Sequence, residues 1–126
     1  MSISRAVVWT DHQSAKIMLV DDEHAMARTI RAHNYQTVQH GSNVRTQHEF
    51  YAELCDELDR VAEVLVTGSH TAIADFRHYV DKHRPPTAAR IVAYDVVDQP
   101  TENQLVAQAR KYFGERDRLG AVASPG

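Results

Sequence analysis

Two short polar segments, each directly after a run of apolar residues, carry side chains that can contact a small ligand. Their members are Asp11 and His12 in the first segment, and Gly68, Ser69, His70 and Thr71 in the second. Free backbone N–H groups and hydroxyls at the start of a helix can bind an anion, so the second segment is a candidate anion site. The simpler interpretation, which we favour, is that Ser69 or Thr71 caps the helix that follows.

The same segments contain a carboxylate and two imidazoles, from Asp11, His12 and His70. Neutral imidazole is a good zinc ligand, and such a set can also act as acid and base. We favour two exposed turn histidines instead, because the eight histidines of the chain are scattered and none has a tight metal-ligand spacing. A small-ligand- or metal-dependent enzyme built on these three residues is therefore the alternative hypothesis. We expect no metal site, no cofactor and no catalytic residue.

The acidic and nucleophilic side chains give no support to nuclease chemistry. A two-metal nuclease needs several carboxylates at neighbouring strand ends, yet residues 64–66 are followed by Thr67 and Gly68 rather than by an acid. Three other acids recur at a spacing of four and are expected on the solvated face of a helix: Glu49, Glu53 and Glu57. Cys55, the only cysteine, is expected to be a buried and unreactive thiol.

Length and charge define the class of protein. A chain of 126 residues is the size of one domain, and hydrophobic and charged fractions of 43% and 25% are ordinary for a globular protein. The net charge of −3 argues against bulk affinity for DNA or other nucleic acid, although it allows a local basic patch. The apolar runs are far shorter than the ~20 residues that span a bilayer, so we expect no membrane partner and a cytoplasmic location.

Apolar runs and helical periodicity predict eight elements in the order β-β-β-α-β-α-β-α. Strands at residues 6–9, 15–20 and 25–32 are separated by short turns, which is typical of an antiparallel meander. A capping box at Thr46 and Glu49 predicts the start of the first helix. The remaining elements are a strand at 64–67, a helix from 69–71 to the Pro85-Pro86 pair, a strand at 90–97, and a helix from about 101 that ends at Gly114.

This order predicts a mixed five-stranded sheet of the ribonuclease H-like α/β class. Its first strand is central, and ligands of open α/β sheets bind beyond the carboxyl ends of strands where the chain leaves in opposite directions. The two polar segments should meet there. The third strand lies at an edge, which makes a homo-oligomeric scaffold a further hypothesis. We expect one domain over residues 1–114 and a flexible C-terminal tail over residues 115–126.

Three segments of the chain resemble a known family. They are VVWTDHQ at residues 7–13, VLVTGS at residues 64–69, and IVAYDVVD at residues 91–98 with the PT and QLVA that follow. They look like the small bacterial translational machinery proteins, which are similar to the middle domain of eukaryotic and archaeal class-1 release factors and of Pelota. The resemblance covers about residues 5–113. It implies the ribonuclease H-like fold and an association with the ribosome or with tRNA.

The sequence departs from these relatives at their catalytic loop. In release factors, the loop after the third strand carries a Gly-Gly-Gln tip that hydrolyses peptidyl-tRNA. The corresponding residues 33–45 contain one glycine, Gly41, and no Gly-Gly-Gln. Ile73 stands where relatives often have a lysine, which weakens a phosphate-binding interpretation of residues 68–71. The resemblance therefore implies a non-catalytic binding module of translation rather than a release factor.

Overall fold

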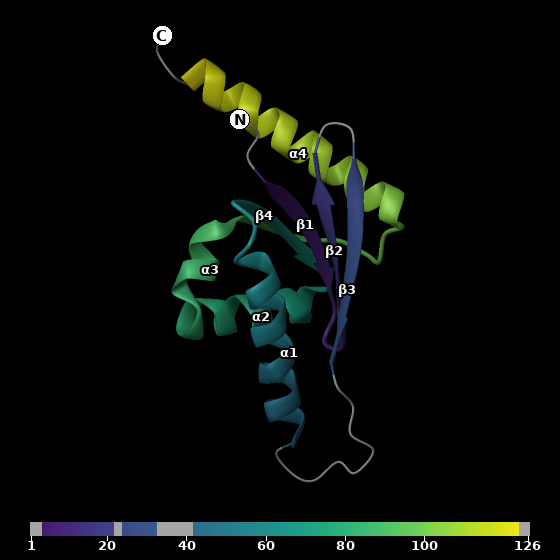
Figure 1. The fold of residues 1–126 in the computed structure, drawn as a ribbon, viewed down its shortest axis with the longest axis vertical. Helices are drawn as coiled ribbons and strands as arrows, with labels where there is room; N and C mark the ends of the chain where they lie inside the picture. Colours follow the sequence, from purple (N-terminus) through teal and green to yellow (C-terminus); the bar gives the residue numbers. More distant parts are fainter. Residues whose placement is uncertain (1–3, 22–23, 33–41, 124–126) are drawn as a thin grey trace.

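The computed structural model describes residues 4–21, 24–32 and 42–123, and these form a five-stranded sheet with helices on both faces (Figure 1). In chain order the elements are β1 Arg5–Thr10, β2 Ser14–Val20, β3 Ala25–Arg31, α1 Ser42–Leu58, β4 Glu63–Gly68, α2 His70–His83, α3 Pro85–Arg90, β5 Ile91–Val96 and α4 Glu102–Ala123. Most of the candidate loop at residues 33–45, namely 33–41, lies outside the described residues.

The strand order is β3-β2-β1-β4-β5. β1 pairs with β2, and β2 with β3, in antiparallel orientation, whereas β1–β4 and β4–β5 are parallel pairs. The predicted α/β class, the mixed five-stranded sheet, the central first strand and the third strand at an edge are all confirmed. In this topology, Thr10 at the end of β1 is paired with Gly68 at the end of β4.

Alternation along the central strands divides the core between the two faces of the sheet. Ala6 and Val8 of β1 face a core with α1 and α2, and Val7 faces a second core with α4. The first core contains the larger set of buried side chains, including those of both helices: Phe50, Tyr51, Leu54, Leu58, Phe76 and Val80. In the second core, α4 contributes the stripe predicted from its spacing, namely Leu105, Ala109 and Phe113.

Helix α4 corrects the prediction for the C-terminus. The helix continues through Gly114 to Ala123, so the predicted helix end at Gly114 is wrong. The single domain over residues 1–114 and the flexibility of residues 115–126 stay predictions. A glycine inside a helix costs about 1 kcal/mol relative to alanine. This cost is too small to end a helix whose side chains make stabilising contacts on both sides of the glycine.

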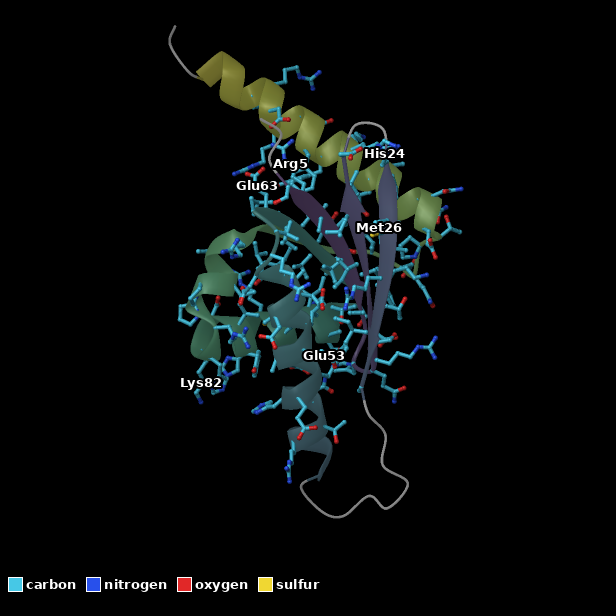
Figure 2. All side chains as sticks on the ribbon, viewed as in Figure 1. Arg5, His24, Met26, Glu53, Glu63 and Lys82 are labelled. Atoms are coloured by element: carbon cyan, nitrogen blue, oxygen red, sulfur yellow. The ribbon has the colours of Figure 1, made fainter. Side chains whose placement is uncertain are left out.

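An ion-pair network fixes the part of α4 beyond Gly114. The guanidinium of Arg5 donates from Nη1 to Asp117 Oδ2 at 2.7 Å and from Nε to Glu63 Oε1 at 2.8 Å. Arg116 donates to the other oxygen of Glu63 at 3.2 Å. Arg5 also lies over the ring of Phe113, 5.0 Å from its centroid. Arg5 and Glu63 lie next to each other at the starts of β1 and β4 (Figure 2).

Asp117→Asn tests whether this network holds the last turns of α4. Hydrogen bonds from Arg5 lower the pKa of Asp117, so the stabilisation exists above the pKa of the unfolded aspartate and is lost as the pH falls through the folded value. We expect Asp117→Asn to melt at a lower temperature than the parent at pH 7, with the two melting temperatures converging as the pH falls through the lowered pKa of Asp117. Asp98→Asn, at an exposed position after β5, removes the same charge and is the control. Equal melting temperatures of Asp117→Asn and the parent at pH 7 would show that the network does not stabilise the fold.

Two helix boundaries also differ from the predictions. α1 begins at Ser42, one turn before the predicted capping box at Thr46. Pro85 and Pro86 do end α2 by His83, but they also occupy the first positions of a short helix, α3, which the sequence analysis missed. Proline suits these positions because its missing N–H has no partner in the first turn of a helix.

The junction between α2 and α3 is fixed by a second polar cluster. Arg84 donates to Asp56 at 2.7 Å and to Asp59 at 3.1 Å. The buried hydroxyl of Thr87 donates to Asp59 at 2.6 Å. Asp56 lies in the last turn of α1 and Asp59 directly after it, so these contacts attach α3 to the end of α1.

Candidate functional site

Asp11 organises the turn between β1 and β2. Its Oδ1 accepts hydrogen bonds from the backbone N–H groups of Gln13 and Ser14, each at 2.7 Å. Its own N–H donates to the carbonyl of Ser14 at 3.0 Å, and the carbonyl of Gln13 accepts from the N–H of Ala32 at 2.7 Å. This is the local bonding pattern by which aspartate stabilises turns. One carboxylate oxygen of Asp11 is thus occupied by the backbone.

His12 connects this turn to α2. Its Nε2 lies 3.0 Å from Oδ2 of Asp75; the side chain of His12 is half-buried and that of Asp75 is exposed. His70, in contrast, lines a separate hollow of about 500 Å³ with neighbours that include Arg77, Asp81 and Tyr94. The two imidazoles of the predicted set therefore lie in different surroundings. Within the described residues, no group of three His, Cys, Asp or Glu side chains is placed to hold a metal ion.

Gly68 ends β4 at a point of very close contact with β1. A Cβ atom at this position would lie 2.2 Å from the carbonyl oxygen of Thr10. Gly68 also accepts a hydrogen bond from the N–H of Val97 at 3.1 Å. The parallel pairing places the two polar segments side by side at the carboxyl ends of β1 and β4, as the sequence predicted.

Ser69 is the N-cap residue of α2, but by its backbone alone. Its φ and ψ of −69° and 155° are extended, and its carbonyl accepts from the N–H of Ile73 at 3.0 Å. Its side chain makes no capping hydrogen bond. Thr71 lies in the first turn and is exposed. The prediction that Ser69 or Thr71 caps the helix is confirmed for the position of Ser69, although the Ser69 hydroxyl makes no capping hydrogen bond. Contact of the six predicted residues with a ligand stays a prediction.

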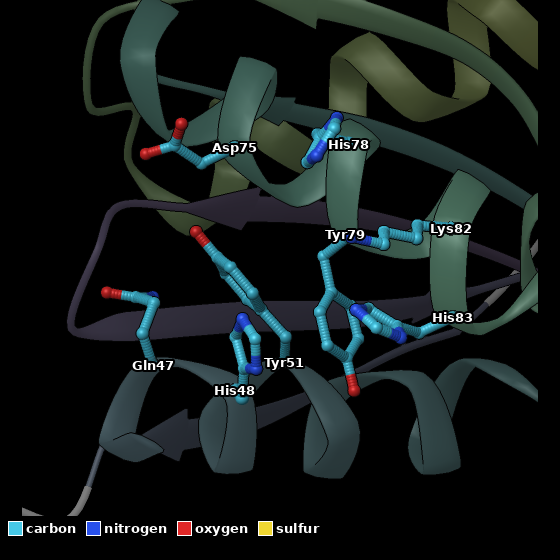
Figure 3. A pocket seen from close by; sticks show the side chains of 8 residues that line it. All are labelled: Gln47, His48, Tyr51, Asp75, His78, Tyr79, Lys82 and His83. Carbon is cyan, nitrogen blue, oxygen red and sulfur yellow. The ribbon is translucent and has the colours of Figure 1, made fainter. Parts of the chain in front are cut away.

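A second site, which the sequence analysis missed, lies between α1 and α2 (Figure 3). We name it the α1–α2 groove; its volume is about 390 Å³, and its lining residues are Gln47, His48, Tyr51, Asp75, His78, Tyr79, Lys82 and His83. The helical spacing of Gln47 with Tyr51, and of Tyr79 with His83, was the available signal. Such i, i+4 pairs lie on one face of a helix. Only the packing of α1 against α2 shows that the two faces oppose each other.

Aromatic rings form one wall of the α1–α2 groove. The rings of Tyr79 and His83 lie 5.0 Å apart, and His48 lies 5.3 Å from Tyr79 and 5.7 Å from His83, all in tilted arrangements. Beneath them, Tyr51 packs against Tyr79 at 5.4 Å and edge-on against Phe76 at 5.3 Å. Such tilted and edge-to-face contacts stabilise aromatic clusters. The wall is thus attached to the core through Tyr51.

Two buried polar atoms that line or adjoin this wall make no hydrogen bond of ordinary geometry within the part of the chain that the structure describes. They are the hydroxyl of Tyr51 and the Nε2 of Gln47. Burial, together with the charge of Asp75, raises the pKa of Tyr51 to about 12, so the hydroxyl keeps its proton at neutral pH. Burial likewise raises the pKa of Cys55 to about 11, which keeps the thiol protonated. Cys55 is fully buried, as predicted.

The raised pKa of Tyr51 predicts a loss of stability in alkali. Between pH 10 and 12 the unfolded chain releases the phenolic proton before the folded chain does, so stability present below pH 10 is lost as the pH rises. We expect the parent to lose on the order of 1–2 kcal/mol more than Tyr51→Phe over this range. Urea denaturation at a series of pH values measures the difference. Parallel stability curves for the two proteins would contradict the prediction.

The glutamates of α1 follow the predicted pattern in part. Glu53 is exposed (Figure 2), and Glu49 forms an exposed pair with Arg45 at 3.1 Å. Glu57 is instead half-buried and pairs with Arg28 of β3 at 3.0 Å. The stripe is therefore only partly solvated, and its last member attaches α1 to the edge strand.

Comparison with known proteins finds similarity in structure but not in sequence. No protein-family model and no curated protein sequence matches the chain. Among solved structures, Pelota from Archaeoglobus fulgidus superposes with a TM-score of 0.64 at 15% identity, covering 97% of this chain and 35% of that one. An archaeal translation termination factor gives 0.60 at 15% identity, covering 94% and 39%. Pelota from Thermoplasma acidophilum gives 0.58 at 11% identity, covering 86% and 36%.

These similarities show a shared fold, that of the release-factor-like domains. The chain spans little more than a third of the length of each of these proteins. The predicted similarity to Pelota and to release factors is confirmed at the level of the fold. Membership of the bacterial family named above has no support from the sequence comparisons and stays a proposal. In the described part of the chain, no helix has the length and apolar character needed to cross a bilayer.

Proposed function

We propose that this chain is a binding module of translation that associates with the ribosome or with tRNA and does not hydrolyse peptidyl-tRNA. The observation that carries the proposal is the superposition of almost the whole chain on Pelota and on a translation termination factor. The sequence contains no Gly-Gly-Gln, so the hydrolytic part of the release-factor resemblance is not transferred. The part of the resemblance that we apply to this chain is the fold, which would present a binding surface.

Co-sedimentation with ribosomes tests the association. Purified protein is mixed with ribosomes, with or without tRNA, and centrifuged through sucrose at low and at high salt. We expect it to sediment with ribosomes at low salt and to be released at high salt, because contacts with RNA phosphates weaken as salt rises. A peptidyl-tRNA hydrolysis assay on the same mixture should show no release. Protein that stays at the top of the gradient at every salt concentration would disprove the proposal.

The edge strand β3 favours a second candidate function, a homo-oligomeric scaffold. No strand among the described residues pairs with the outer side of β3, on which Met26 lies (Figure 2). The side chain of Met26 is 67% exposed. Exposed edges of this kind pair with further strands. Light scattering over a range of concentrations distinguishes monomer from oligomer, and Met26→Lys should shift any oligomer toward monomer. A mass of one chain at all concentrations would exclude this candidate.

The enzyme hypothesis on Asp11, His12 and His70 has less support, because Asp11 accepts from its own turn, His12 pairs with Asp75, and His70 lines a separate hollow. It is tested by thermal melts with Zn²⁺, Mn²⁺ and Mg²⁺. A ligand at 100 times its dissociation constant stabilises a protein by about 2.7 kcal/mol. No shift with any of these ions would remove the metal-dependent form of the hypothesis.

A further inference from the structure

The α1–α2 groove contains a polar end whose hydrogen bonds are not satisfied within the protein. Tyr51 is only 2% exposed, and within the described residues neither its hydroxyl nor the Nε2 of Gln47 makes a hydrogen bond of ordinary geometry, although Gln47 lies close enough to lower the pKa of Tyr51. A buried polar group without a partner destabilises the folded state, so such groups call for an explanation. Figure 3 shows the hydroxyl of Tyr51 directed toward Asp75, with Gln47 at the same end of the groove. Two donors and one carboxylate acceptor therefore line this end.

The opposite end of the groove is cationic. Lys82 and His83 lie there, away from Gln47 (Figure 3). Among the described residues Lys82 makes no ion pair, whereas Asp75 is paired with His12 at 3.0 Å. An anionic group is therefore attracted to the Lys82 end and repelled from the Asp75 end. The aromatic wall of Tyr79, His48 and His83 joins the two ends and offers faces on which a planar ring can stack.

The groove thus selects a ligand with three properties. The ligand needs a planar ring with an anionic group on one side. On the other side, the ring needs a polar edge that carries a hydrogen-bond acceptor next to a hydrogen-bond donor. Guanine has such an edge: its carbonyl oxygen accepts, and the neighbouring ring N–H and amino group donate. Adenine lacks this pattern, because its corresponding edge places an amino donor where guanine has the carbonyl. The volume of about 390 Å³ is near the lower limit for small-molecule sites, which suits a single nucleotide.

We propose that the α1–α2 groove binds one guanine nucleotide. The carbonyl oxygen of the base accepts from the hydroxyl of Tyr51 and from Gln47, and the N–H groups of the base donate to Asp75. The base stacks on the aromatic wall, and the phosphate lies at Lys82 and His83. The nucleotide is either a free mononucleotide or an unpaired guanine of an RNA chain. This inference does not depend on ribosome association, because the groove is formed by the chain alone.

Calorimetric titration of the purified chain with GMP, AMP and guanosine tests the proposal. We expect GMP to bind at least about tenfold more tightly than AMP, which has the wrong edge. We expect it also to bind more tightly than guanosine, which lacks the phosphate. Equal affinity for GMP and AMP, or no heat with GMP at millimolar concentration, would overturn the proposal.

Variants of the two ends locate the site. Tyr51→Phe should weaken GMP binding about five- to tenfold while keeping or raising the melting temperature, because the lost hydroxyl has no partner in the free protein. Lys82→Gln, at an exposed position, should reduce the affinity for GMP to that for guanosine. Tyr94→Phe removes a phenol outside the groove and should bind GMP as the parent does. Unchanged GMP binding in both Tyr51→Phe and Lys82→Gln would also overturn the proposal.

A short single-stranded RNA distinguishes the two sources of the nucleotide. An oligouridine with one central guanine is titrated alone and in competition with GMP. Tighter binding than GMP, with mutual competition, identifies an exposed guanine of RNA as the ligand. Binding of GMP without binding of the RNA identifies a free nucleotide. If the RNA binds without competing with GMP, it occupies another surface, and the groove is a site for the free nucleotide.

Discussion

The Gly68→Ala variant is expected to lose about 3 kcal/mol of stability or more, because a methyl group at this position has no space. Its Cβ would lie 2.2 Å from the backbone oxygen of Thr10, and 3.2 Å from the carbonyl carbon and nitrogen of the same residue. Those atoms belong to the backbone of a central strand. They can move away only if the pairing between β1 and β4 opens at its carboxyl end. Urea denaturation followed by circular dichroism measures the loss.

Gly114→Ala is the matched control for this experiment. It makes the same chemical change, but within 4 Å of the added Cβ there is no atom besides the helix's own neighbouring backbone. Alanine is a better helix former than glycine by about 1 kcal/mol. Gly114→Ala should therefore be more stable than the parent by up to that amount. If both variants lost similar stability, the close contact between Gly68 and Thr10 could not be the cause.

Phe76→Ala is expected to cost about 3–5 kcal/mol, the range for removal of a fully buried aromatic ring. Phe76 is 0% exposed, lies in the core between the sheet and the two helices, and contacts the ring of Tyr51 edge-on. Its loss should also loosen the floor of the α1–α2 groove. The measurement is the free energy of unfolding in urea at neutral pH.

Met26→Ala provides the comparison for Phe76→Ala. It also truncates a large apolar side chain, but Met26 is 67% exposed on the edge strand. Surface substitutions of this kind change stability by about 0.5 kcal/mol or less. A loss below about 1 kcal/mol in Phe76→Ala would mean that α2 does not pack on the sheet as described.

The sequence predicted the sheet because its signals were local and consistent. Continuous apolar runs mark β1 and β4, which are buried on both faces, and short turns join β1, β2 and β3. The errors lie where packing overrides local preference. Gly114 predicts the end of a helix, but the hydrogen bond between Arg5 and Asp117 stabilises the part of α4 beyond Gly114. Pro85 and Pro86 were predicted to end α2. They do so, and they also occupy the first positions of α3.

The candidate sites were predictable to different degrees. The two polar segments at the carboxyl ends of β1 and β4 followed from the strand order, so their proximity was foreseen. The partners of their side chains were not, because the contact of His12 with Asp75 joins residues far apart in the chain. The α1–α2 groove depends entirely on how two helix faces meet. The sequence shows the residues of each face but not the packing that opposes them.

The central position of β1 has a consequence for the order in which the chain folds during synthesis. Its antiparallel partner β2 follows after a short turn, whereas its parallel partner β4 begins 58 residues after Arg5. The meander of the first three strands can therefore pair early, while the other side of β1 waits for residues 63–68 to be synthesised. During that interval the central strand is itself an open edge. Its apolar residues are then at greatest risk of pairing with another nascent chain, and a pause in translation before β4 should increase aggregation.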